Sequence, residues 1–135
     1  MTATIHYEGN LRCNARHLHS NSLIETDAPT DNRGKGERFS PTDLVCTALA
    51  TCMITTMAMK ATDMGIELKD TTIDVKKYMA SDPRRIAKID VIIIFPPTLE
   101  LEEKVKFTLQ RTGDNCPVIK SLHADIIINT TYNWQ

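Results

Sequence analysis

The chain has 135 residues, of which 41% are hydrophobic, 24% charged and 5% aromatic, and its formal net charge at pH 7 is −1. We expect one domain over residues 1–135, because a chain of this length supports a single modest core. The charges are balanced, and no basic run is interleaved with aromatic residues. Composition therefore argues against nucleic acid or an anionic membrane surface as a partner.

The four cysteines, Cys13, Cys46, Cys52 and Cys116, stand at irregular spacings along the chain. The first residues are polar and alternating, without the apolar region of a secretory signal. We therefore expect a cytoplasmic protein with free thiols in a reducing compartment. Its cysteines are candidates for chemistry rather than for a disulfide framework.

The first third of the chain has the alternating pattern of extended hairpins. Three strands are expected within residues 2–9, 10–20 and 22–29. Gly-Asn and Ser-Asn pairs between these segments supply the turns. A loop rich in Gly, Pro, Asp and Asn follows over residues 28–39, and loops of this length inside a compact domain are often functional.

A long uncharged helix is expected after this loop. Ser40 can be its N-cap, Pro41 suits its first turn, and Asp43 completes a capping box, while Gly65 ends the helix. Residues 44–59 carry no charge, but this window is shorter than the roughly 20 apolar residues of a membrane span and contains several threonines. A helix without a polar face must be covered on all sides. We therefore predict a homodimer, in which a sheet covers one side of the helix and a partner subunit the other.

The second half of the chain is expected to begin with a hairpin. Strands within residues 70–81 and 85–95 flank the turn sequence SDPR. A second helix is expected over residues 96–115, because Thr98 can cap its start and Gly113 can end it.

This second helix has one apolar stripe, Leu101, Val105 and Leu109, and is therefore expected to be amphipathic and peripheral. A short helical turn over residues 116–122 and a last strand over residues 123–134 complete the chain. The order βββ-α-ββ-α-β predicts an α+β fold with largely antiparallel sheets.

Two cysteines could form a reactive pair. Cys52 lies in the middle of the uncharged helix, where a free cysteine is most often a small buried hydrophobe, and where a reactive thiol needs a cation from elsewhere. Cys116 directly precedes Pro117 at the start of a helical turn, where backbone N–H groups favour a thiolate; a packed or capping residue is the alternative. A peroxidatic and resolving couple needs two such thiols. Their separation of 64 residues neither supports nor excludes contact.

The remaining cysteines and the histidines have simpler interpretations. Cys46 lies about 120° from Cys52 on a helical wheel and is expected in the core. Cys13, beside Arg12, is expected to be structural. His17 and His19 are a close pair, but no CxxC or HxxxH spacing occurs. We therefore expect neither a metal site nor a cofactor.

The block FSPTDLVCTALATCM, followed by NCPVIKSL, resembles the osmotically inducible protein C (OsmC) and organic hydroperoxide resistance (Ohr) family. The likeness covers nearly the whole chain: the opening strands, the loop, the Pro-led long helix with a cysteine a little over two turns in, and the Cys-Pro pair before the last strand. It implies an OsmC/Ohr-like fold in an intertwined homodimer. In such a dimer the long central helices pack between sheets shared by both subunits.

The resemblance also implies an activity, a thiol-dependent peroxidase that reduces organic hydroperoxides to alcohols. Matched by motif, Cys52 is the peroxidatic thiol and Cys116 the resolving thiol. The family activates its first cysteine with an arginine of the N-terminal strands, for which Arg12 is the nearest match and Arg16 the reserve candidate. A dithiol of the lipoyl type or similar would reduce the resulting disulfide.

One position departs from the family pattern. In the best-known peroxidases a glutamate follows the proline at the helix start and holds the arginine, whereas this chain has Thr42, with Asp43 one residue later. Two other functions therefore stay open: a non-enzymatic dimer that binds an apolar small molecule, and a cysteine redox sensor with a protein partner. An apolar pocket beside Cys52 is expected, lined from the helix by Met53, Ile54 or Met57.

Overall fold

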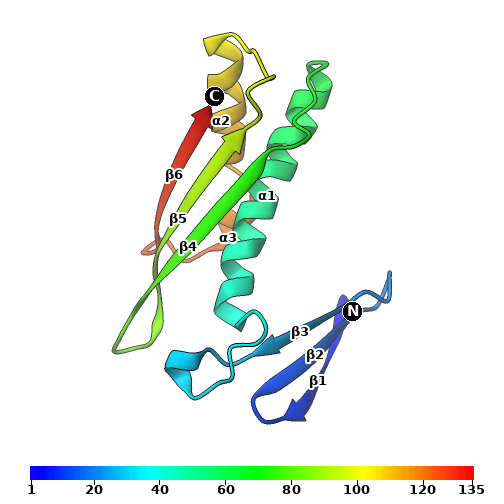
Figure 1. Ribbon diagram of the computed structural model, residues 1–135, viewed down its shortest axis with the longest axis vertical. Coiled ribbons are helices and arrows are strands. Elements are labelled where there is room, and N and C mark those ends of the chain that lie inside the picture. Colours follow the sequence, from blue (N-terminus) through cyan, green and yellow to red (C-terminus); the bar gives the residue numbers. More distant parts are fainter. The chain divides into compact units, whose positions relative to one another are not determined.

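The computed structural model describes all residues, 1–135 (Figure 1). Its fold is α+β, as predicted, with two three-stranded sheets. The chain divides into two compact units, Met1–Val45 and Cys46–Gln135, and the boundary between them falls inside the central helix. That residues 1–135 form one domain stays a prediction.

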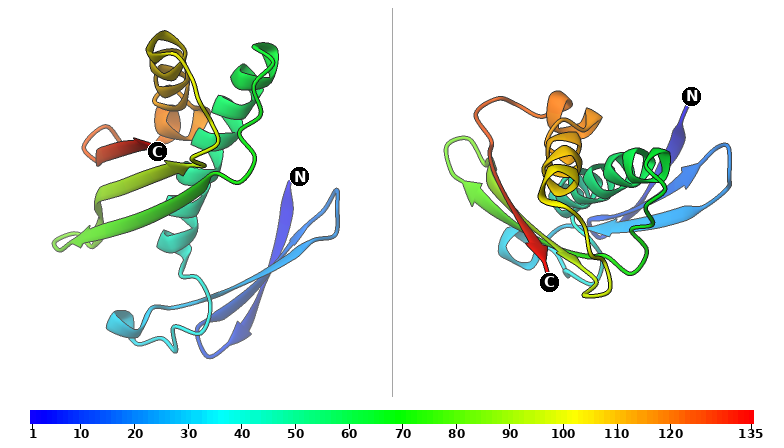
Figure 2. Two further views of the ribbon diagram at one scale, coloured as in Figure 1. Left: turned by 45° about the horizontal axis from the view of Figure 1, so that its top comes forward. Right: turned by 90° about the horizontal axis from the view of Figure 1, so that it is seen from above.

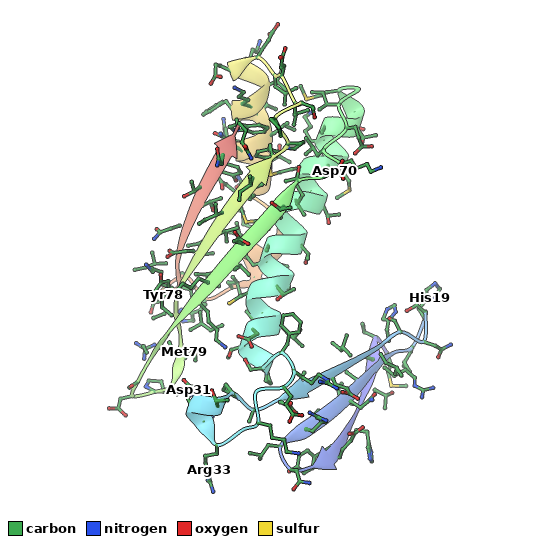
Figure 3. The ribbon with its side chains drawn as sticks, viewed as in Figure 1. His19, Asp31, Arg33, Asp70, Tyr78 and Met79 are labelled. Carbon is green, nitrogen blue, oxygen red and sulfur yellow. The ribbon has the colours of Figure 1, made fainter.

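The first unit contains an antiparallel sheet of the order β1-β2-β3. Its strands are β1 (Ala3–Gly9), β2 (Arg12–His17) and β3 (Leu23–Asp27). The predicted turn after β1 is confirmed, and two residues with positive φ, Asn10 and Leu11, form it. The loop predicted over residues 28–39 contains one short 3-10 helix, η1 (Thr30–Asn32). Figure 3 labels Asp31, which lies in this helix, and Arg33, which follows it.

One face of this first sheet is apolar. Ile5 pairs with Ala15, which pairs with Ile24, while Tyr7 pairs with Cys13, and directly paired residues share a face. Ile5, Tyr7 and Ile24 are 61%, 59% and 53% exposed. The first unit has no buried hydrophobic side chain at all, since its two buried residues are Asp27 and Ser40. Hydrophobic burial within this unit therefore contributes little to its stability.

The central helix α1 (Pro41–Asp63) begins at the predicted capping box. The backbone N–H of Ser40 donates to Asp43 Oδ2 at 2.9 Å, and the backbone N–H of Asp43 donates to Ser40 Oγ at 3.1 Å. The helix ends as predicted at Gly65, whose φ is +72°. The N–H groups of Gly65 and Ile66 bond back to the carbonyls of Thr62 and Ala61, the paired bonds of a Schellman motif.

The helix is longer than its uncharged stretch. By length and composition α1 could cross a membrane, with 23 residues and a mean hydropathy of 1.5 in its 18-residue window. The prediction concerned the uncharged residues 44–59 alone, and the length of the whole helix does not exclude a span. The core helix of a soluble protein meets the same criterion, and one stripe of α1 is buried.

The second unit contains the sheet β4-β5-β6. Its strands are β4 (Thr72–Ala80), β5 (Arg85–Phe95) and β6 (Ile127–Trp134). The predicted hairpin of β4 and β5 is confirmed, but β6 runs parallel to β5. A parallel neighbour needs a crossover connection. Here two helices make the crossover, α2 (Glu103–Gly113) and α3 (Pro117–Ser121).

The second helix starts later than predicted. Its N-cap is Glu102, which makes no side-chain capping bond, so the prediction that Thr98 caps the helix is wrong. The residues after Phe95 form a turn instead, in which the N–H of Leu99 bonds to the carbonyl of Pro96 at 3.0 Å. The predicted end at Gly113 is confirmed.

The core of the second unit lies between α1 and the sheet. The buried side chains of α1 recur every three or four residues on one face; they are Cys46, Leu49, Ala50, Met53, Met57 and Ala61. Alternate residues of β5 supply the other wall: Ile89, Val91, Ile93 and Phe95. In Figure 2 the helices lie on the same face of this sheet. The prediction that a sheet covers one side of the uncharged helix is thus confirmed.

The opposite side of α1 is exposed and uncharged. Ala48, Thr51, Thr55 and Met59 lie on it. The hydroxyls of Thr51 and Thr55 donate to the carbonyls of Thr47 and Thr51 at 2.8 and 2.7 Å. Because these hydroxyls are satisfied within the helix, this side can contact another surface without loss of hydrogen bonds.

Candidate functional site

Two cysteines that are distant in sequence meet in the second unit. Cys52 lies on α1 and Cys116 is the N-cap of α3. Both pack at the same core, and Cys52 is near enough to raise the pKa of the Cys116 thiol. The two thiols come close because the β4–β5 hairpin and α2 return the chain to the same side of the sheet as α1. The separation of 64 residues in the sequence does not by itself predict that the two thiols lie close together.

Cys116 is fully buried, at 0% exposure. Burial raises the pKa of its thiol. The backbone N–H groups of Ile119 and Val118 oppose that shift, while the neighbouring Cys52 adds to it. The predicted position at a helix start is confirmed. The expected stabilisation of a thiolate there is outweighed, because removal from water disfavours the charged form more strongly.

Cys52 is the more accessible of the two thiols, being partly buried. Its Sγ atom lies 4.0 Å from Thr56 Oγ1, and that hydroxyl donates to the Cys52 carbonyl at 2.7 Å. A solvent-borne oxidant therefore reaches Cys52 before Cys116. This order suits a pair in which one thiol attacks a substrate and the second closes a disulfide.

The methionines predicted to line a pocket beside Cys52 do not do so. Met53 and Met57 are 0% exposed and belong to the core, because they lie on the stripe of α1 that faces the sheet. Ile54 is partly buried and also packs against the core. The prediction that either methionine lines an open pocket is therefore wrong.

The other two cysteines have different surroundings. Cys46 is 3% exposed and part of the core cluster, as predicted. Cys13 lies on β2 between Tyr7 and Thr26 of the neighbouring strands. A structural role for Cys13 stays a prediction.

Arg12 begins β2 in the first unit, and three hydrogen bonds hold its guanidinium. Nε and Nη2 donate to the two carboxylate oxygens of Asp27, each at 2.8 Å, and Nη2 also donates to Glu37 at 3.0 Å. Asp27 is the cross-strand partner of Arg12 and is 2% exposed. This bidentate geometry is the strong form of an arginine–carboxylate pair.

The ion pair keeps both of its members charged. The hydrogen bonds from Arg12 lower the pKa of Asp27, against the opposing effect of burial. The hydrogen bonds to Asp27 and Glu37 raise the pKa of Arg12. Arg16, the reserve candidate, is exposed and lies four residues further along the strand. Of the two arginines, Arg12 alone is held in a defined orientation.

Asp27 and Glu37 are functional candidates that sequence reasoning missed. The resemblance placed the arginine's carboxylate partner at the helix start, where Thr42 stands; its hydroxyl lies 3.1 Å from Ser40 Oγ. In this chain the carboxylates come from β3 and the loop instead. Cross-strand neighbours depend on strand register, which the pattern of this polar strand leaves open.

No group of three or more His, Cys, Asp or Glu side chains is placed to hold a metal ion. The rings of His17 and His19 are 6.3 Å apart. The Nδ1 atom of His17 pairs instead with Ser20 Oγ at 2.7 Å in the hairpin turn.

A shallow groove of about 330 Å³ lies beside the segment that leads to Cys116. Its lining residues are Asp114, Ile119, Ile128, Thr130 and Tyr132. The groove runs between α3 and β6, in the same unit as the thiols.

The chain is similar to a family of known proteins and to several solved structures. Residues 34–131 match the family described as OsmC-like protein. The chain is similar to a solved structure from Psychrobacter arcticus 273-4, named for an osmotic stress induced and detoxification response. The two are 47% identical, with a TM-score of 0.94, and the match covers 98% of this chain and 96% of that chain. No curated relative matches the chain.

Two further structures share the fold at lower identity. An organic hydroperoxide resistance protein OsmC from Legionella pneumophila has a TM-score of 0.75 at 14% identity, over 97% of this chain and 94% of that chain. The organic hydroperoxide resistance protein OhrB of Bacillus subtilis has a TM-score of 0.70 at 15% identity, over 98% of each chain. The OsmC/Ohr-like fold predicted from the sequence is thereby confirmed.

Proposed function

Since the chain belongs to the OsmC-like protein family, we propose that it is a thiol-dependent peroxidase that reduces organic hydroperoxides to alcohols. The observation that carries this proposal is that Cys52 and Cys116 lie close together at the same core. Two free thiols, one partly buried and one fully buried, meet across 64 residues of sequence. Such a pair can be oxidised to a disulfide and reduced again without a cofactor.

The reaction has three steps. The Cys52 thiolate attacks the O–O bond of the hydroperoxide, so that Cys52 becomes a sulfenic acid and the alkoxide leaves and is protonated to the alcohol. The Cys116 thiol then attacks the Cys52 sulfur, which forms the Cys52–Cys116 disulfide and releases water. A dithiol of the lipoyl type or similar reduces the disulfide by exchange and is itself oxidised to a disulfide.

The cation that activates Cys52 is assigned to Arg12, as the family resemblance implies. Asp27 and Glu37 take the place of the missing glutamate, because they hold the guanidinium in one orientation. A fixed cation stabilises a developing thiolate at a lower reorganisation cost than a mobile one.

A homodimer in the cytoplasm is part of the proposal. The apolar face of the first sheet, with Ile5, Tyr7 and Ile24 more than half exposed, needs a cover. So does the uncharged outer side of α1, on which Thr51 and Thr55 lie. A second copy of the chain supplies apolar surface for both, in accord with the intertwined dimer that the resemblance implies.

One observation supports a second candidate function, a non-enzymatic dimer that binds an apolar small molecule. The Arg12 guanidinium faces two carboxylates, so the local charge is negative and less suited to stabilise a thiolate. This candidate predicts a ligand-dependent rise in melting temperature that survives the Cys52→Ser substitution.

The test is a thiol count on reduced protein treated with one equivalent of an organic hydroperoxide. The wild type should lose about two thiols per chain as the disulfide forms. Cys52→Ser should lose none, whereas Cys116→Ser should retain a Cys52 sulfenic acid that a sulfenate-specific reagent traps. Cys13→Ser, the control, should behave as the wild type. An unchanged thiol count in the wild type would refute the peroxidase.

A further inference from the structure

A half-buried phenol contacts the turn that leads to Cys116. Tyr132 lies on β6, and its hydroxyl donates to Asp114 Oδ1 at 2.7 Å and approaches the carbonyl of Gln110 at 3.1 Å. Asp114 is the C-cap of α2, directly before the short segment that ends in Cys116. One side chain of the sheet thus holds the end of α2.

The turn between α2 and α3 is otherwise held by local bonds. The N–H of Asn115 bonds to the carbonyl of Thr112 at 3.3 Å, and the N–H of Cys116 bonds to the carbonyl of Gly113 at 3.1 Å. These bonds shape the turn but do not attach it to the sheet. The Tyr132–Asp114 bond joins it to β6 through side chains.

Packing around Gly113 leaves no room for the turn to move inward. A Cβ atom at Gly113 would lie 2.8 Å from Met57 Sδ and 3.1 Å from the Tyr132 hydroxyl. The turn therefore touches both α1, which carries Cys52, and the phenol of Tyr132. Its position relative to α1 determines the distance between the two thiols.

We propose that Tyr132 and Asp114 are positioning residues for the resolving step, and that their hydrogen bond holds Cys116 where its thiol reaches Cys52. This inference rests on the proposed function. It concerns the second step, in which the Cys116 thiol displaces hydroxide from the Cys52 sulfenic acid and water leaves. If the turn is loosened, the sulfenic acid lasts longer and a second hydroperoxide oxidises it to sulfinic acid.

The first experiment separates the two steps in time. Tyr132→Phe removes only the hydroxyl. Sulfenic acid formation, first order in hydroperoxide, should proceed at the wild-type rate, whereas disulfide closure should slow about 10-fold, because a misplaced reacting group loses its effective concentration. Excess hydroperoxide should then yield more Cys52 sulfinic acid than in the wild type, measured by intact mass.

Asp114 offers a conservative and a disruptive variant. Asp114→Asn keeps an oxygen that accepts from the phenol and should close the disulfide at nearly the wild-type rate. Asp114→Ala should slow closure by no more than Tyr132→Phe, because the phenol can still donate to the Gln110 carbonyl. The double variant should be no slower than Tyr132→Phe.

Tyr78→Phe is the matched control. Tyr78 lies on β4 of the same sheet (Figure 3). By register it shares a face with Lys88, and that face is opposite to the one on which Tyr132 lies. The Nζ atom of Lys88 lies 4.0 Å from its ring centroid. Loss of this phenol should leave both steps unchanged.

A second experiment does not depend on peroxide. In a glutathione redox buffer, glutathione disulfide attacks one thiol, and the other displaces glutathione to close the Cys52–Cys116 disulfide. The equilibrium measures the effective concentration of one thiol at the other, which should fall about 10-fold in Tyr132→Phe. This result would support the positioning role even if hydroperoxide failed to oxidise the wild type and the proposed function fell.

Three results would overturn the inference. Tyr132→Phe could close the disulfide at the wild-type rate and effective concentration, with only a lower melting temperature, as expected of a purely structural tyrosine. Asp114→Asn could be as slow as Tyr132→Phe. Tyr78→Phe could slow closure as much as Tyr132→Phe.

Discussion

The two units of this chain use different physical means to hold their candidate residues. In the second unit, Cys52 and Cys116 meet at a core of fully buried aliphatic and aromatic side chains. In the first unit, no hydrophobic side chain is buried, and Arg12 is held by a nearly buried carboxylate, that of Asp27, and by Glu37. One set is positioned by packing and the other by charge-assisted hydrogen bonds.

This difference indicates which unit keeps its geometry without a covering surface. A thiol pair at a packed core keeps its geometry because movement would open cavities. An ion pair on a small, uncovered sheet depends on strand pairing and on whatever covers the apolar face that includes Ile5 and Ile24. We therefore expect the first unit, rather than the second, to respond to dimerisation, charge substitution and acid.

The largest expected effect concerns Arg12. Arg12→Lys should slow the reaction of Cys52 with an organic hydroperoxide by about 100-fold, because a lysine cannot keep the bidentate geometry that orients the charge. Stopped-flow measurement of sulfenic acid formation checks this. Arg16→Lys is the control and should react at the wild-type rate. An unchanged rate in Arg12→Lys, or a slow Arg16→Lys, would assign the cation elsewhere.

A smaller effect is expected on assembly. Ile5→Asp places a charge on the apolar face of the first sheet and should raise the dimer dissociation constant by about 10-fold or more, because that charge must be buried when the face is covered. Sedimentation velocity over a concentration series measures it. Ile92→Asp, on a half-exposed site of β5, should leave the dissociation constant unchanged. Equal effects of both substitutions would contradict a role for the first sheet.

The smallest effect is on stability against pH, and it has opposite signs in the two units. The pKa of Asp27 is lowered from 3.8 by Arg12. As pH falls below that value, the unfolded chain takes up the proton first, so this contribution to stability is lost in acid. The pKa of Cys116 is raised from 9.0 by burial. Above that pH the unfolded chain loses the proton first, and stability falls as pH rises.

Denaturant unfolding at a series of pH values checks both signs. Asp27→Asn should flatten the acid limb and leave the alkaline limb as in the wild type. Cys116→Ser should leave the acid limb as in the wild type and flatten the alkaline limb only in part. The half-buried phenol of Tyr132, whose pKa burial also raises, still titrates in base. An acid limb that persists in Asp27→Asn would show that another carboxyl group produces it.

Local patterns were sufficient for most of the secondary structure. Ser40, Pro41 and Asp43 predicted the start of α1, and Gly65 predicted its end, because capping and positive φ are properties of a few adjacent residues. Thr98 misled the prediction of α2. A threonine before acidic residues predicts a cap, but the chain made a turn at Pro96 and began the helix at Glu103.

By itself, the sequence determined the two cysteines, the arginine and the order of the elements that carry them. Only the tertiary structure decided that Cys52 meets Cys116, that β6 lies parallel to β5, and that Asp27 and Glu37 hold Arg12. The physical reason is the range of the interactions. Helix caps and alternation act within a few residues, whereas a thiol contact or a cross-strand ion pair joins residues that only packing and register bring together.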